Sequence, residues 1–236
     1  MKKTYKIISI LLYLVSLLIL LFCIKIRFSS STNLTTQFKI ILFLLVSIFI
    51  YICGYIQIKK LNYNKKILKV HLVIYFLLYI VIIFTLTLFD EIYGRQGFKL
   101  ISWNKDLLET YFKYSFNIIP FSTIKLYING FINGIVSSKV FFNNIFGNIL
   151  AFMPFSIFIP LIFKKVDKYY KLLLIMIPII VIIELMQFIT MSGSCDIDDL
   201  ILNILGITIM YFVSKIKPIN GLINKIFYLG VENEKE

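Results

Sequence analysis

The stretch GSCDIDDLILNILGITIMYFV, residues 193–213, places three carboxylates just ahead of a long apolar run. Asp196, Asp198 and Asp199 suit the first turn of a helix, where acidic side chains cap free backbone N–H groups and are favoured by the helix dipole. The apolar residues that follow are typical of a membrane-spanning helix. The stretch therefore predicts a helix that enters a membrane with its acidic end at one surface.

The composition of the whole chain indicates the same class of protein. Of 236 residues, 59% are hydrophobic and only 16% are charged, and the mean hydropathy is +0.89. Soluble domains contain fewer apolar and more charged residues. We therefore expect an all-α fold, a polytopic membrane helical bundle of about six transmembrane helices. The expected spans are 7–24, 40–57, 70–89, 145–163, 172–190 and 200–214, of which the last is short.

The net charge is +13, and the distribution of the basic residues along the chain predicts the orientation of the protein in the membrane. If the N-terminus is inside, lysines gather in the short inner segments 2–6, 59–69, 164–171 and 215–235. Most of the other basic residues fall in one long outer loop, where the positive-inside rule has little weight. Both termini are therefore expected to be cytoplasmic. The excess positive charge is explained by membrane topology and by contact with anionic lipids, so no nucleic-acid partner is expected.

Polar side chains recur near the predicted outer ends of the last three spans. Asn203 lies one helical turn below Asp199 on the same helix face, and Gln187 lies one turn from Glu184. At 1.5 Å per residue, Asn148, Glu184 and Asn203 fall roughly 6–10 Å below the outer surface. A charged group at this depth should face a polar partner or a wet cavity, because its exposure to lipid is costly. The spacing predicts that these side chains meet in one pocket.

A purely structural interpretation of the same residues stays open. Aspartates serve as helix caps, and Asn and Gln form interhelical hydrogen bonds in many membrane proteins. Three aspartates in one turn nevertheless exceed the need for a cap, because they repel one another. The long outer segment 90–143 is equally open to two interpretations: a passive aromatic cover in the headgroup layer, or a functional loop.

Four motifs in this order resemble those of the VanZ family, over residues 80–214. They are NIIPFSTI (117–124), NIFGNILAFMPFSIFIP (144–160), IELMQ (183–187) and DIDDLILNILG (196–206). Family members often carry an Arg before the aspartates, where this chain has Gly-Ser-Cys at 193–195. The resemblance predicts N-terminal spans in 1–79, a VanZ-like membrane domain in 80–214 and a cytoplasmic tail in 215–236.

The resemblance implies a multi-pass protein of the bacterial cell membrane that is linked to resistance against glycopeptide antibiotics, teicoplanin above all. It brings no known reaction, and a housekeeping role in the envelope is an alternative. We expect a polar pocket, open to the outer leaflet, that binds or modifies an amphiphile. Membrane lipids, a lipid-linked cell-wall intermediate or the acyl tail of a lipoglycopeptide are the expected partners.

The site residues can be assigned on this basis, although whether the protein is an enzyme stays open. Glu184 would be the buried general base. A Mg²⁺ or Ca²⁺ ion could bind the aspartates, but no metal site is assigned, and no His or Cys cluster suggests zinc. A non-enzymatic antibiotic shield and a transporter or flippase are the alternatives. The catalytic candidates are Glu184, Asp196, Asp198 and Asp199, and the ligand-binding candidates are Asn148, Gln187, Asn203 and Asn117.

Overall fold

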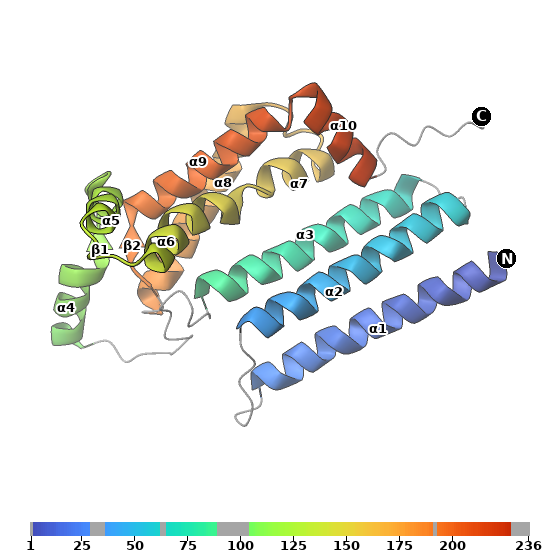
Figure 1. Ribbon diagram of the computed structural model, residues 1–236, viewed down its shortest axis with the longest axis horizontal. Helices are drawn as coiled ribbons and strands as arrows, with labels where there is room; N and C mark the ends of the chain where they lie inside the picture. Colours follow the sequence, from blue (N-terminus) through green and yellow to red (C-terminus); the bar gives the residue numbers. More distant parts are fainter. Residues whose placement is uncertain (1, 29–35, 62–64, 89–103, 191–192, 228–236) are drawn as a thin grey trace. The chain divides into compact units, whose positions relative to one another are not determined.

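The computed structural model describes residues 2–28, 36–61, 65–88, 104–190 and 193–227. The described residues are mostly helical, which confirms the expected all-α bundle. The chain divides into two compact units (Figure 1). The first comprises residues 1–82 and 221–236, and the second comprises residues 83–220.

The first unit is built from long apolar helices around a small core. Val46 and Ile50 pack with Leu78 at its centre. Its elements are α1 (Lys2–Phe28), α2 (Thr36–Tyr55), the π-helix η1 (Ile56–Lys60), most of α3 (Lys65–Leu88) and most of α10 (Lys217–Ile226).

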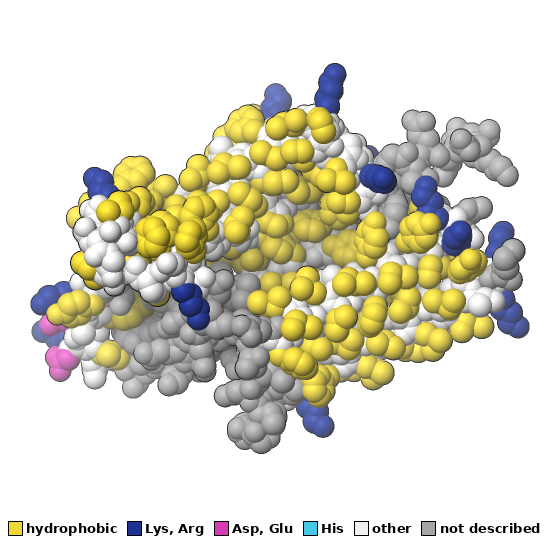
Figure 2. Space-filling view, in the orientation of Figure 1, with side chains coloured by type: hydrophobic (Ala, Val, Ile, Leu, Met, Phe, Trp, Pro, Cys, Tyr) yellow, Lys and Arg dark blue, Asp and Glu magenta, His cyan; other side chains and the backbone are white. Residues whose placement is uncertain are grey.

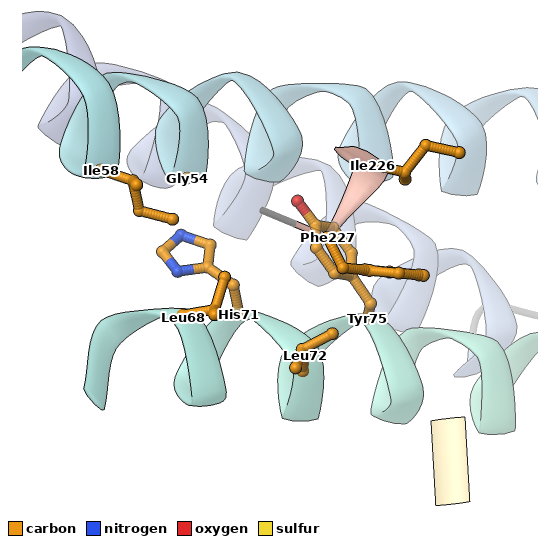
Figure 3. A pocket seen from close by; sticks show the side chains of 8 residues that line it. All are labelled: Gly54, Ile58, Leu68, His71, Leu72, Tyr75, Ile226 and Phe227. Atoms are coloured by element: carbon orange, nitrogen blue, oxygen red, sulfur yellow. The ribbon is translucent and has the colours of Figure 1, made fainter. Parts of the chain in front are cut away.

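His71 is a buried structural residue of this unit. Its Nε2 lies 2.7 Å from the Tyr13 hydroxyl and its Nδ1 lies 2.8 Å from the Ile67 carbonyl oxygen, so both ring nitrogens are engaged. Gly54 faces the ring so closely that a Cβ there would lie 3.1 Å from its Cδ2. Beside the ring is a cavity of about 10 Å³, lined mainly by apolar side chains and by Tyr75 (Figure 3). The cavity is about the size of one water molecule.

The second unit is organised around α9 (Ile197–Val213), which packs against α6, α7 and α8. Gly206 allows the closest approach, because a Cβ there would overlap the Ile149 carbonyl of α6. Small residues permit such backbone contact between membrane helices. The other elements are α4 (Lys105–Ser115), β1 (Phe116–Asn117), α5 (Ser122–Ile132), α6 (Ser138–Phe152), α7 (Phe155–Ile162), α8 (Tyr169–Ile189) and β2 (Cys195–Asp196).

Five stretches of the described chain are long and apolar enough to cross a membrane. The sixth expected span corresponds to α9, which has only 17 residues and is followed by α10 after a bend of 95°. Figure 2 shows hydrophobic side chains over the visible surface of α1 and α2, as expected of helices that face lipid. The five stretches are Lys2–Cys23, Ile40–Lys60, Lys66–Thr85, Ser138–Ile162 and Tyr169–Ile189.

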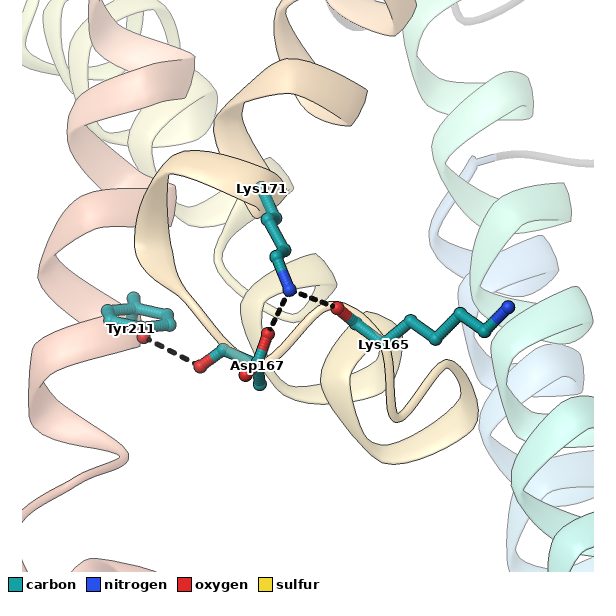
Figure 4. Close-up of polar contacts among 4 residues, drawn as sticks. All are labelled: Lys165, Asp167, Lys171 and Tyr211. Atoms are coloured by element: carbon teal, nitrogen blue, oxygen red, sulfur yellow. Dashed lines mark hydrogen bonds and ion pairs between the residues drawn. The ribbon is translucent and has the colours of Figure 1, made fainter.

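The turn between α7 and α8 is held by exposed polar contacts (Figure 4). Lys171 Nζ donates to Asp167 Oδ1 at 2.6 Å and to the Lys165 carbonyl at 3.0 Å. The Tyr211 hydroxyl of α9 donates to the Asp167 carbonyl at 3.4 Å. The hydrogen bond from Lys171 holds the pKa of Asp167 below its usual value. Because this ion pair is exposed, we expect it to add little stability.

Candidate functional site

The outer segment predicted between residues 90 and 143 is tied directly to the α8–α9 turn. Strands β1 and β2 pair in parallel, with Phe116 opposite Cys195 and Asn117 opposite Asp196. The Tyr111 hydroxyl of α4 also donates a hydrogen bond to the Gly193 carbonyl. The described part of the segment therefore supplies polar partners for the aspartates at the start of α9.

Asp198 is almost completely buried, with 1% of its surface exposed, and it caps a different helix from its own. Its Oδ1 accepts from the Phe121 N–H at 2.5 Å. Its Oδ2 accepts from the N–H groups of Thr123 and Ile124 at 2.8 and 3.0 Å. These donors form the N-terminus of α5, where a negative charge is favoured. The contacts of Asp198 are thus those of an anchor for α5, and its catalytic role stays a prediction.

Asp196 links three elements of the second unit. Its Oδ1 accepts from the Asp198 N–H at 2.9 Å, the capping contact expected from the sequence, and from Asn117 Nδ2 at 2.8 Å. Its own N–H points at Glu184 Oε2 of α8, 3.5 Å away. Asn117 also donates to the Thr123 hydroxyl at 3.0 Å. Residues from β1, β2 and α8 thereby meet at one end of α9.

Asp199 forms a polar contact with α6: its Oδ1 accepts a hydrogen bond from Asn148 Nδ2 at 2.5 Å. Asn203, one turn further along α9, is only 3% exposed, and its Oδ1 has no hydrogen-bond partner among the described residues. At 100° per residue, the direction of Asn203 around the axis of α9 falls between the directions of Asp196 and Asp199. We call Asn117, Asn148, Glu184, Asp196, Asp199 and Asn203 the polar cluster.

Gln187 has a hydrogen-bond partner outside the polar cluster. It is buried on α8, and its Nε2 donates to the Thr87 carbonyl near the end of α3 at 3.2 Å. This contact ties α8 to the last turn of α3 within the second unit. The expectation that Gln187 binds ligand with Glu184 therefore stays a prediction.

Cys195 is a free thiol beside the carboxylates. Burial raises the pKa of this thiol, and the nearby carboxylates of Glu184, Asp196 and Asp199 raise it further. A thiol with a raised pKa is a poor nucleophile at neutral pH, because the thiolate is the reactive form. The surroundings of Cys195 therefore do not activate it.

The aspartates do not fit a shared Mg²⁺ or Ca²⁺ ion. The carboxylates of Asp196, Asp198 and Asp199 each meet different protein donors. Within the described ranges, no three His, Cys, Asp or Glu side chains gather closely enough to hold a metal ion. Hard cations need several oxygen ligands around one point. The arrangement thus gives no support for the cation that the sequence suggested.

Several contacts of the site could not be assigned from sequence. The backbone N–H groups of Phe121, Thr123 and Ile124, the Tyr111 hydroxyl and the Thr87 carbonyl carry no distinctive chemical signal. The one available signal was the NIIPFSTI motif, which contains Asn117 and the start of α5. Its Pro-Phe-Ser sequence is compatible with a helix start, since Pro is favoured near helix N-termini.

These features define a multi-pass membrane protein whose short last span begins in a cluster of carboxylates and amides. A family model described as VanZ/LLP1 matches residues 76–218. The chain therefore belongs to the VanZ/LLP1 family, as the motifs indicated. No curated protein and no solved structure matches it.

Proposed function

We propose that the polar cluster is a ligand site in the outer leaflet of a bacterial cell membrane. It binds or modifies the polar headgroup of an amphiphile, either a lipid-linked cell-wall intermediate or a lipoglycopeptide antibiotic. The link to resistance against teicoplanin and other glycopeptides comes from the family resemblance. Membership of the VanZ/LLP1 family supports the proposal, because the matched region contains every residue of the cluster.

The observation that carries the proposal is the buried side chain of Asn203. Its Oδ1 has no partner among the described residues, and leaving such an acceptor unpaired costs about 1–3 kcal/mol. A protein selected only for stability would place an apolar residue there. A ligand hydroxyl or amine that donates to Oδ1 would remove the cost. Unsatisfied groups of this kind are expected at functional sites.

Glu184 is the residue best placed for proton transfer. It is buried, and its Oε2 lies 3.5 Å from the Asp196 N–H. A carboxylate held at the edge of such a cluster can act as a general base on a ligand hydroxyl. In a non-enzymatic shield, the same carboxylate would serve only as a hydrogen-bond acceptor.

The proposal is tested by measuring the minimum inhibitory concentration of teicoplanin in a sensitive host that expresses each variant. Glu184→Gln and Asp199→Asn keep shape and hydrogen bonding but cannot ionise. Both should abolish resistance while membrane abundance stays near that of the wild type. Asp167→Asn is the matched control, because it removes an exposed carboxylate in the turn between α7 and α8. Full resistance from both acidic variants would refute a catalytic role for these carboxylates.

A shield and an enzyme differ in what happens to the ligand. Mass spectrometry of lipids and antibiotic from expressing cells would show a chemically altered species only for an enzyme. The altered species should disappear in Glu184→Gln. A shield leaves the ligand unaltered in both strains.

A further inference from the structure

The 118–121 turn, between β1 and α5, carries apolar side chains that nothing in the described chain covers. Ile118, Ile119 and Phe121 are 69%, 66% and 52% exposed, and Pro120 is exposed as well. Burying such side chains away from water is favourable. Adjacent exposed apolar residues of this kind mark a contact with lipid or with another protein.

Two backbone N–H groups of this turn are hydrogen-bonded to side chains of the protein. Phe121 adopts a left-handed conformation with φ 66°, which is uncommon outside glycine. Asp198 holds the Phe121 N–H, and Asn117 Oδ1 accepts from the Ile119 N–H at 3.0 Å. The Phe121 N–H is thus directed at the start of α9, whereas the side chains of the turn stay exposed.

Both ends of the segment that contains the turn are attached to the ends of membrane helices. On one side, Asp198 belongs to the first turn of α9. On the other side, α5 ends at Ile132 and α6, which begins the Ser138–Ile162 span, starts at Ser138. The five intervening residues reach at most about 18 Å. The turn must therefore lie near one membrane surface.

An apolar surface continues from α5 onto the exposed side of α6. Phe131 of α5 stacks on Phe141 of α6 with ring centroids 4.5 Å apart, and Phe141 meets Phe142 at 5.4 Å. Phe142 and Phe146 are exposed on the candidate span, where lipid is the expected neighbour. Figure 2 shows hydrophobic side chains gathered over α5 and α6.

We propose that the 118–121 turn is inserted among lipid acyl chains, and that Asp198 holds it beside the polar cluster. The occupant of this surface is the bilayer and not a second protein, because α5, which directly follows the turn, shares an apolar surface with the membrane span that begins at α6. Helix α4, by contrast, carries Lys105, Asp106, Glu109 and Lys113, all exposed, and stays in water. Insertion of the turn into lipid requires no ligand in the polar cluster.

The test is tryptophan fluorescence of the full chain in vesicles of phosphatidylcholine and phosphatidylglycerol. The single native Trp is first replaced by Trp103→Phe. Phe121→Trp then reports on the turn, and Ile119→Trp is a second reporter in case the first variant fails to fold. The matched control is Tyr114→Trp on α4, since Tyr114 is 75% exposed.

We expect blue-shifted emission from the turn reporters, reduced to about half by dibrominated phosphatidylcholine and unaffected by aqueous iodide. The α4 control should show the opposite pattern. Quenching of the turn reporters by iodide would place the turn in water and overturn the inference. Emission insensitive to both quenchers would mean that a second protein surface covers the turn, which overturns it equally.

Discussion

Asp198 accepts a hydrogen bond from the backbone N–H of Thr123, 2.8 Å away, although 75 positions separate the two residues in the sequence. This contact joins the first turn of the last span to the first turn of α5. A carboxylate that acts as the cap of another helix has a defined structural role. Asp198 is therefore an anchor, whereas Asp196 contacts the Asn117 side chain of β1 and Asp199 contacts the Asn148 side chain of α6.

We predict that Asp198→Asn loosens the start of α5. Asn replaces one acceptor oxygen with an N–H₂ group that faces backbone donors, which should cost about 1–3 kcal/mol. Hydrogen exchange measured by mass spectrometry should become faster at the amides of Phe121, Thr123 and Ile124. Asp199→Asn is the control, because Asp199 contacts Asn148 of α6 and its replacement should leave these amides protected. Unchanged protection in Asp198→Asn would show that the cap is not needed.

Gly206→Ala should destabilise the packing of α9 on α6. The added methyl group would overlap the Ile149 carbonyl, and overpacking of this kind typically costs about 1–3 kcal/mol. The unfolding temperature of the protein in detergent should fall. Gly221→Ala in α10 is the matched control, because no atom lies within 4 Å of the position that an alanine Cβ would take there. Alanine also favours a helix. Equal unfolding temperatures for the two variants would contradict the close approach at Gly206.

Labelling of Cys195 in intact cells tests the predicted orientation. An impermeant maleimide should react with it without lysis, since the α8–α9 turn is predicted to be outside. Because the pKa of this thiol is raised, the rate of maleimide labelling should keep increasing above pH about 8.5, where the labelling rate of an ordinary thiol levels off.

Matched reporters complete the labelling experiment in a background without other cysteines. Asn133→Cys, exposed between α5 and α6, should react from outside, and Lys164→Cys, exposed between α7 and α8, only after lysis. The reverse pattern would invert the topology. It would also place the polar cluster on the cytoplasmic side.

Much of the fold was predictable, because hydrophobic runs of about 20 residues have few alternatives in a membrane protein. The spacing of polar residues along the spans also predicted a common depth for Asn148, Glu184 and Asn203, since regular helices convert sequence spacing into height. Sequence spacing could not indicate which partner each side chain would contact. The cap on α5 depends on backbone N–H groups, which every residue except proline carries. Gln187 donates to the backbone carbonyl of Thr87, and every residue carries such a carbonyl.

The small-residue contact shows a similar limit. Gly147 on α6 and Gly206 on α9 are both small residues of the kind that can permit a close contact between membrane helices. In the structure, Gly206 of α9 lies directly against the Ile149 backbone of α6. Sequence shows that a small residue is present, but the rotation of a helix about its axis decides which one meets a neighbour.

The central claim, that the polar cluster binds a ligand, is tested most directly by mass spectrometry of molecules that co-purify with the protein. Asn203→Leu removes the unpaired buried oxygen and keeps a similar volume, so the purified variant should be at least as stable as the wild type. We predict that one amphiphile is enriched with the wild type and with Asp167→Asn. It should be lost from Asn203→Leu and from Glu184→Gln. Identical co-purifying molecules in all four proteins would contradict the claim.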